Sequence, residues 1–93
     1  MRNLIWSKTF SRALKRTIKK HPAFIKNVEQ TLKLLAADPF SPQLETHKLK
    51  GKLEGSWACS AGFDLRIVFD FVKGEGKDED IFLMGIGTHD EVY

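Results

Sequence analysis

The sequence predicts an α+β protein in which two N-terminal antiparallel helices pack on a mainly antiparallel sheet of three to four strands. Residues 8–20 and 22–37 repeat apolar side chains at helical spacing, on either side of a His-Pro break. Residues 63–72 alternate apolar with other side chains, and an apolar run at 81–86 follows a polar, glycine-containing loop at 73–79. This second pattern is typical of two neighbouring antiparallel strands.

Size and composition indicate one compact domain, 1–93, because a chain this short cannot build a second hydrophobic core. Hydrophobic residues make up 42% and charged residues 29%, a balance that excludes disordered and fibrous classes. No run approaches the ~18 apolar residues of a membrane span, and the N-terminus lacks a secretory signal pattern. The single Cys59 excludes an internal disulfide. We therefore expect a cytoplasmic protein without a membrane partner.

Charge is divided unevenly between the two parts of the chain. Residues 1–52 contain 12 of the 15 basic and 3 of the 12 acidic side chains, a net charge of +9. Residues 53–93 contain the remaining 3 basic and 9 acidic side chains, a net charge of −6. A polycationic surface of this kind attracts phosphate backbones or an acidic protein partner, and charge alone does not choose between them.

The N-terminal elements can be placed from capping and breaking residues. An apolar run at 3–6 predicts a short opening strand, and Ser7 or Thr9 is suited to cap the helix predicted over 8–20. Pro22 is suited to the start of the second helix, because that position needs no amide donor. The second helix is expected to end near Ala37, before an Asp-Pro pair.

The sheet is predicted from the pattern after residue 40. Residues 40–55 are expected to be an extended connection that contains His47, and residues 56–60 a short strand. In the next strand, one face is entirely apolar and should pack on the helices: Phe63, Leu65, Ile67, Phe69 and Phe71. Asp64 and Arg66 are then neighbours on the opposite, open face, and Gly87 is expected to end the last strand and release the chain into the C-terminal tail.

The residues that could perform chemistry lie in the C-terminal half. They are the histidines His47 and His89, the strand residues Asp64 and Arg66, and the lysines Lys48, Lys50 and Lys52. RNA cleavage through the 2′-hydroxyl needs a base, an acid and fixed positive charge on the phosphate. Histidine, with an unperturbed pKa near ~6.5, can exchange protons near neutral pH. The sequence therefore predicts a small RNA-cleaving site that needs neither a metal nor a cofactor.

Two other chemistries are disfavoured. Cys59 lies in a short predicted strand beside an aromatic residue, which is typical of an inert core thiol rather than a nucleophile. His47, Asp64 and His89 could be considered as zinc ligands, but none of the close spacings of zinc sites is present.

The order of elements, with His-Lys-Leu-Lys-Gly at 47–51, Leu-Arg-Ile-Val-Phe at 65–69 and Gly-Thr-His at 87–89, resembles the RelE/ParE superfamily of type II toxin–antitoxin toxins. The YafQ-like branch is the most similar. The resemblance covers essentially the whole chain and implies a RelE-like, microbial-RNase-like fold. It further implies a ribosome-dependent mRNA endoribonuclease (an mRNA interferase) that needs no metal, with ribosome and mRNA as partners and a cognate antitoxin as inhibitor.

By position, the resemblance implies catalytic roles for His47, Asp64, His89 and Tyr93, and Arg66 matches the strand arginine of RelE. The histidines would form the proton-transfer pair, with their order as acid and base left open. Asp64 would orient a histidine or act as a base, and its structural alternative is an ion pair with Arg66. Arg66 would stabilise the phosphorane, and Lys48, Lys50 and Lys52 would contact neighbouring phosphates. Tyr93 would stack on a base or donate a proton.

Two positions depart from the YafQ-like pattern: Ser60 stands where a second histidine is expected, and Gly85 stands where an arginine is expected. Serine does not exchange protons near pH 7 and glycine has no charge, so the sequence leaves open whether Arg66 and the lysines compensate. The alternatives are a non-nuclease toxin of this fold, either a ParE-like gyrase inhibitor or a degenerate antitoxin-binding homologue. A basic binding module unrelated to toxins is the third possibility.

Overall fold

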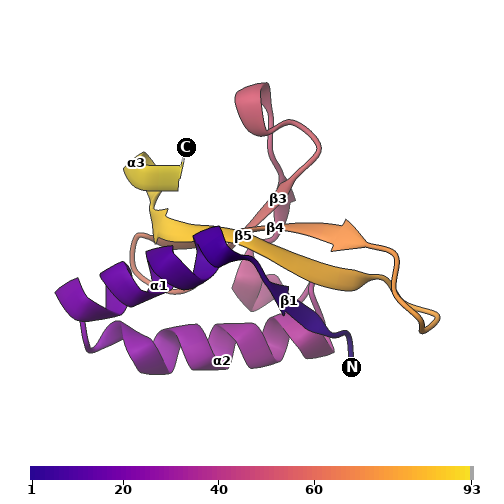
Figure 1. Cartoon of the computed structure of the whole chain (residues 1–93), viewed down its shortest axis with the longest axis horizontal. Helices are drawn as coiled ribbons and strands as arrows, with labels where there is room; N and C mark the ends of the chain where they lie inside the picture. Colours follow the sequence, from indigo (N-terminus) through magenta and orange to yellow (C-terminus); the bar gives the residue numbers. More distant parts are fainter. Residues whose placement is uncertain (93) are drawn as a thin grey trace.

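The computed structural model describes residues 1–92 and is built around a five-stranded mixed sheet (Figure 1). Its strands are β1 (Leu4–Trp6), β2 (His47–Lys48), β3 (Trp57–Ser60), β4 (Leu65–Val72) and β5 (Asp80–Thr88). Its helices are α1 (Lys8–Lys20), α2 (Phe24–Ala37), α3 (His89–Val92) and two short 3-10 turns, η1 (Pro42–Leu44) and η2 (Gly51–Leu53). The predicted α+β class is confirmed, with α1 and α2 on one face of the sheet.

The sheet has five strands rather than the predicted three to four, in the order β1-β5-β4-β3-β2. The strand predicted at 3–6 is confirmed as β1, which pairs in parallel with β5. The additional strand is β2, which pairs antiparallel with β3 through His47 and Lys48. Two residues are too few to show a period in sequence, so only the cross-strand pairing reveals this edge strand.

The first helix has the predicted bounds, and Ser7 caps it by accepting a hydrogen bond from the Phe10 amide at 3.0 Å. The predicted start of the second helix at Pro22 was wrong by two residues. Pro22 and Ala23 form a turn, in which the Phe24 amide bonds the carbonyl of His21, and α2 begins at Phe24. None of the helices within residues 1–92 has the length and apolar content required to cross a membrane.

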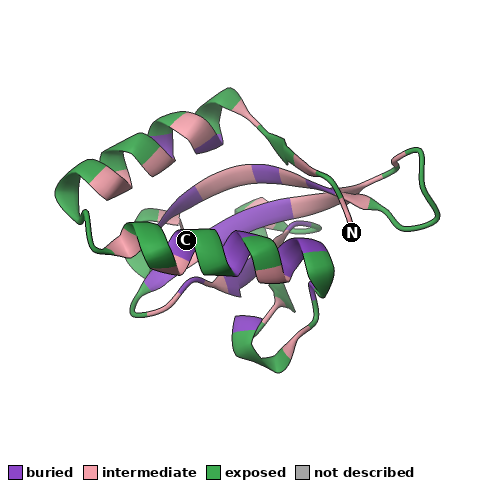
Figure 2. Ribbon diagram, turned by 90° about the horizontal axis from the view of Figure 1, so that it is seen from below, coloured by how far each residue is buried: buried purple, intermediate pink, exposed green. Residues whose placement is uncertain are grey.

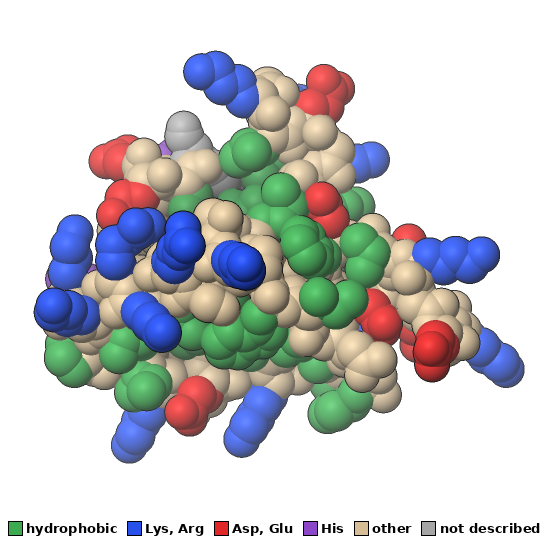
Figure 3. Space-filling model, in the orientation of Figure 1, with side chains coloured by type: hydrophobic (Ala, Val, Ile, Leu, Met, Phe, Trp, Pro, Cys, Tyr) green, Lys and Arg blue, Asp and Glu red, His purple; other side chains and the backbone are tan. Residues whose placement is uncertain are grey.

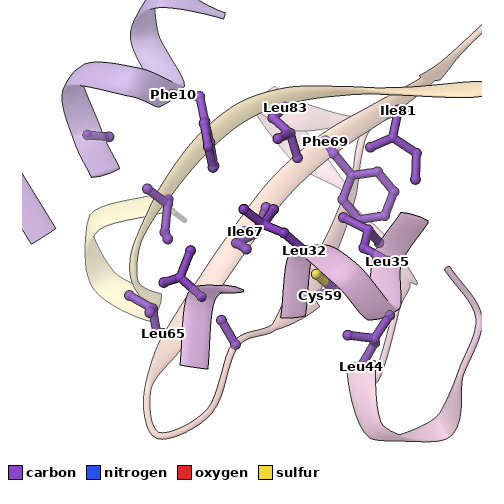
Figure 4. Close-up of a cluster of buried hydrophobic side chains, with 14 residues drawn as sticks. Phe10, Leu32, Leu35, Leu44, Cys59, Leu65, Ile67, Phe69, Ile81 and Leu83 are labelled. Atoms are coloured by element: carbon purple, nitrogen blue, oxygen red, sulfur yellow. The ribbon is translucent and has the colours of Figure 1, made fainter. Parts of the chain in front are cut away.

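The main core lies between the sheet and the two long helices (Figures 2 and 4). Alternate residues of β4 point into it, and they meet α1 through Phe10 and α2 through its buried leucines. The largest fully buried side chains are Phe10, Leu35, Leu44, Leu65, Ile67, Phe69, Ile81 and Leu83. The predicted direction of the apolar face is therefore confirmed within β4.

The opposite face of the sheet is more covered than the sequence predicts. A second apolar cluster on this face contains Leu49, Ala58 and Val68, and Met84 and Val92 pack against it. The cover comes from the η2 loop and from α3, which both rise above the sheet in Figure 1, on the side opposite α2. The expectation that the last strand ends before Gly87 was wrong by two residues, because β5 continues to Thr88, and the tail begins with α3.

A β-bulge interrupts the pairing of β4 with β5. Val68 pairs with Gly85, whereas the next residue, Phe69, pairs with Leu83, so Met84 is the extra residue of β5. Met84 and Gly85 thereby follow one another on the face away from α1 and α2, and the alternation is reset before Ile86 returns to the core. The bulge decides which side chains of β5 reach the open face.

Candidate functional site

A single helical turn, α3, holds the tail histidine against the end of the sheet. The Oε1 atom of Glu91 accepts a hydrogen bond from the Thr88 amide at 2.8 Å, which is the capping-box arrangement of a Thr-x-x-Glu sequence. This amide lowers the pKa of Glu91, helped by the Thr88 side chain and by the charges of Lys20 and Arg16. His89 is the first helical residue, and its amide donates to the Asp64 carbonyl at 3.1 Å.

Gly87 permits α3 to fold back onto β5. A Cβ atom at this position would lie 3.1 Å from Cβ of Glu91 and 3.3 Å from Cγ1 of Val92. These approaches are tighter than ordinary van der Waals contact, so any larger side chain must push α3 away from the sheet. The Gly-Thr-His-x-Glu sequence thus positions His89 at the end of the sheet.

We expect Gly87→Val to displace α3, and His89 with it, and to cost about 1–3 kcal/mol of unfolding free energy through overpacking. Gly76→Val is the matched control, because a Cβ at Gly76 has nothing within 4 Å. Urea unfolding of both variants checks this. Equal unfolding free energies for the two variants would contradict the placement argument.

Arg66 lies on the open face and is held by its neighbours at the start of β4. Its Nη1 atom donates to the Leu65 carbonyl at 3.0 Å, and to the Phe63 carbonyl and the Ser60 hydroxyl at 3.4 Å each. Ser60 is its cross-strand partner in β3. The serine that departs from the family pattern therefore contacts the arginine that could supply the phosphate charge.

Asp64 contributes through its backbone rather than as a strand-face acid. It lies with Phe63 in the turn before β4, so the expectation that it is a same-face strand neighbour of Arg66 was wrong. Its side chain is exposed, and within residues 1–92 no ion pair joins it to Arg66. Its carbonyl accepts from the His89 amide, which ties the turn to α3.

His47 lies in β2, at the other edge of the sheet, with its side chain exposed. Its Nδ1 atom lies 3.0 Å from the carbonyl oxygen of Glu45, which adopts a left-handed conformation with φ of 50°. A carbonyl only accepts, so Nδ1 carries the proton and the basic lone pair of the neutral ring is at Nε2. The carbonyl of Glu45, two residues before His47, thus favours the tautomer with its proton on Nδ1.

The three lysines of the predicted RNA contact follow His47 along this edge. Lys48 places its Nζ atom 5.7 Å from the centre of the Trp57 ring, Lys50 precedes η2, and Lys52 lies within it. All three side chains are exposed, so their charge is presented to solvent next to the open face.

The structure brings some predicted site residues together and separates others. Asp64, Arg66 and His89 meet at one end of the open face, whereas His47 is three strands from β5, about 14 Å at ~4.8 Å per strand. An open groove of about 270 Å³ lies between α1, α3, the η2 loop and β5, with Val68 and Gly85 among its lining residues. Tyr93 lies outside the described residues.

Gly85 occupies the floor of this groove. The pairing aligns His47, Ala58, Val68 and Gly85 in one row across four strands. A Cβ atom at Gly85 would have nothing within 4 Å. The position that departs from the family arginine is therefore open enough to accept one.

The buried thiol is chemically silent. Cys59 is fully buried, and desolvation raises its pKa to about 12, although the charge of Arg66 opposes the shift. Its role as an inert core thiol agrees with its place in the main cluster. Among residues 1–92, no group of three or more His, Cys, Asp or Glu side chains could hold a metal ion.

We expect Cys59 to resist thiol reagents in the folded protein. At pH 8, a thiol with this pKa is ionised to only about one part in 10⁴, and burial blocks the reagent as well. Ellman's reagent should therefore titrate one thiol in guanidinium and none in native buffer over minutes. Rapid native reaction at pH 8 would contradict this inert role.

Comparisons with known proteins show which solved structures share this fold. A structure of a metal-bound toxin from Helicobacter pylori is 29% identical, with a TM-score of 0.78, and all of both chains is covered. A conserved hypothetical protein from the same organism is 30% identical, with a TM-score of 0.68 and full coverage of both chains. YafQ in the DinJ–YafQ complex of E. coli shares the fold at 18% identity, with a TM-score of 0.78, covering 100% of this chain and 99% of that one.

A search of curated protein sequences found no match. The model of the family described as the bacterial toxin YafQ of type II toxin–antitoxin systems matches residues 2–93, nearly the entire chain. The resemblance found in the sequence is thereby confirmed, and the chain belongs to the YafQ family of type II toxin–antitoxin toxins.

Proposed function

We propose that this toxin is an mRNA endoribonuclease that acts on translating ribosomes in the cytoplasm. The observation that carries the proposal is the joint placement of His89 and Arg66, because the Asp64 carbonyl accepts from the His89 amide and the Phe63 carbonyl accepts from the Arg66 guanidinium. A proton-exchanging ring and a guanidinium at one end of an exposed strand face are suited to a phosphodiester. A gyrase-inhibiting toxin of this fold would not need that pairing.

The reaction divides between proton transfer and charge stabilisation. A base removes the 2′-hydroxyl proton, the 2′-oxygen attacks phosphorus, and an acid protonates the departing 5′-oxygen. The products are a 2′,3′-cyclic phosphate and a 5′-hydroxyl. Arg66 stabilises the negative charge of the phosphorane with a planar donor fork, and His89 exchanges one proton at the same end of the sheet. His47 is the proposed partner for the other proton, a role that requires its ring to reach across the sheet from β2. These side chains supply every role without a metal or cofactor.

The substrate path follows from the separation of the two histidines. A strand of RNA that crosses the open face of the sheet from α3 to β2 would pass Arg66 on β4 before it reaches the lysines Lys48, Lys50 and Lys52. The lysines bind phosphates flanking the cut, and Tyr93 stacks on a base. His47 exchanges its proton at Nε2, the nitrogen that its bond to Glu45 leaves basic.

An acidic antitoxin is the proposed protein partner. An apolar groove of about 610 Å³ runs along α1 between Trp6, Leu14 and Ile18, and Lys15 and Lys19 border it. Lys and Arg side chains gather over this helix in Figure 3. An amphipathic acidic helix fits this combination of apolar floor and basic border. Loss of a copurifying acidic protein in a Leu14→Glu variant tests the surface.

Cell-free translation with purified toxin tests the activity, with mRNA ends mapped by primer extension. We expect new ends within translated codons, and losses of about 10²–10⁴-fold in each of the His47→Ala and His89→Ala variants. Lys77→Ala, in the distant hairpin loop, is the control and should cleave like the unchanged protein. Intact mRNA with folded toxin would reject the nuclease and direct the next assay to gyrase inhibition.

The single variants separate the two histidines. Loss of cleavage in both assigns them as the proton-transfer pair. Loss of cleavage in His89→Ala alone would show that His47 takes no part in proton transfer. Its place on β2, an edge strand of the sheet, would then be the reason.

A further inference from the structure

One large apolar side chain stands out in the turn beside the proposed site. Phe63 was expected on the apolar face of the strand, but it precedes β4 and is 77% exposed. Its φ is 49°, in the left-handed region that a bulky residue rarely adopts. Neither burial nor backbone preference accounts for phenylalanine here, and such combinations occur at functional surfaces.

Phe63 is the outer member of a stack of three rings. Its ring centre lies 5.4 Å from that of Phe24 with an interplanar angle of 21°, and Phe24 lies 4.8 Å from His21 at 27°. We call these three residues the aromatic stack. It joins the α1–α2 connection to the turn before β4, and its exposed end presents a flat ring to solvent. A nucleobase of any kind can stack on such a surface.

A basic pocket of about 280 Å³ borders the aromatic stack. Arg16 and Lys20 line it from α1, and His21 and Phe24 of the stack line it as well. Glu91 also contributes, but its carboxylate is bonded to the Thr88 amide. The positive charges of Arg16 and Lys20 exceed the single negative charge of Glu91, so the pocket favours a phosphate group next to the stacked base.

The turn that carries Phe63 touches both proposed catalytic residues. The Phe63 carbonyl accepts a hydrogen bond from the Arg66 side chain, and the Asp64 carbonyl accepts one from the His89 amide. The turn, α3 and the α1–α2 connection lie at the same end of the sheet in Figure 1. An RNA strand leaving Arg66 in this direction would therefore meet the aromatic stack within a nucleotide or two.

We propose that the aromatic stack and the basic pocket form a subsite for single-stranded RNA, in which a base flanking the cut stacks on Phe63 and its phosphate binds Arg16 and Lys20. The subsite rests on the proposed endoribonuclease function and extends it. It makes the toxin read its substrate by stacking, which tolerates any base, rather than by base-edge hydrogen bonds.

Binding is measured separately from cleavage with a fluorescein-labelled hexanucleotide of 2′-O-methyl RNA, whose blocked 2′-oxygen cannot attack. Phe63→Ala should weaken binding about five- to a hundredfold, the range found when one stacked base loses its ring. Phe63→Trp should keep the affinity, and Phe40→Ala is the control, because Phe40 is 56% exposed but packs near Trp57 in another aromatic cluster. An Arg16→Gln, Lys20→Gln double variant should lower the salt slope of binding by about 0.7, the value for one phosphate of a single strand.

The Phe63→Gly variant tests whether a loss of RNA binding comes from the missing ring or from a destabilised fold. Glycine accepts a positive φ without strain, so this variant should unfold at a temperature no lower than the unchanged protein while still losing RNA affinity. Unchanged hexanucleotide binding in Phe63→Ala and Phe63→Gly overturns the subsite. If those variants instead lose only the antitoxin complex, the stack is a protein-docking surface and the RNA subsite is equally overturned.

The two proposals fail in different ways. Cleavage that depends on His89 together with Phe63-independent RNA binding would leave the nuclease standing and remove the subsite. Phe63-dependent RNA binding without any cleavage would retain an RNA-binding surface and remove the nuclease.

Discussion

Arg66→Gln should lower cleavage of translated mRNA by about 10²–10³-fold, the usual cost of removing one preorganised donor from developing charge. The Arg66 guanidinium is held by the Leu65 and Phe63 carbonyls and by the Ser60 hydroxyl, so it needs little reorganisation as charge develops on phosphate. Glutamine retains length and hydrogen bonding but carries no charge. The rate of appearance of primer-extension ends in cell-free translation measures the effect.

Two further variants sharpen this test. Arg66→Lys keeps the charge but loses the planar fork, so we expect an intermediate rate. Arg12→Gln removes an exposed arginine of α1 and controls for the loss of one positive charge. If Arg66→Gln and Arg12→Gln cleave equally well, Arg66 has no special role at the phosphate.

Introducing an arginine at position 85 should restore cleavage by about tenfold or more in the Arg66→Gln background. Arg66 of β4 pairs with Gly87 of β5, and Gly85 lies two residues before Gly87 on β5. Positions 66 and 85 are therefore diagonal neighbours about 7–8 Å apart. Open space above Gly85 accepts the new side chain without a clash. The double variant Arg66→Gln, Gly85→Arg then supplies from β5 the charge lost from β4.

Gly85→Gln in the same background is the matched control, since it adds comparable bulk without charge. Recovery with arginine but not with glutamine would show that either strand can supply the phosphate charge. It would also mean that Arg66 can take the place of a family arginine at position 85. No recovery, with RNA binding intact, would mean that an arginine at position 85 cannot reach the same phosphate.

Patterns that arise within a single element could be predicted from the sequence. The bounds of α1, the end of α2 before Asp38 and the hairpin loop at 73–79 agree with the structure, because each depends on local capping, chain breaking or side-chain period. Among the candidate site residues, Arg66 lies on the open face of the central strand as its apolar alternation predicts.

Features that depend on contacts between distant segments were missed or misplaced. The strand at His47 exists because β3 is available to pair with it, and Phe63 leaves the core because the chain turns at Gly62 before β4 begins. A local signal for α3 was present in Thr88-x-x-Glu91, and it identifies the capping box. That signal did not show that α3 would cover the open face.

By itself, the sequence determined the α+β class, the core face of the central strand, the toxin family and the identity of the groups able to exchange protons or bind phosphate. Only the tertiary structure decided how these groups are distributed: Arg66 beside Ser60, His89 tied to the Phe63–Asp64 turn, and His47 three strands from β5. The physical reason is that side-chain period and capping are local properties, whereas strand order and register depend on which distant surfaces bury each other best.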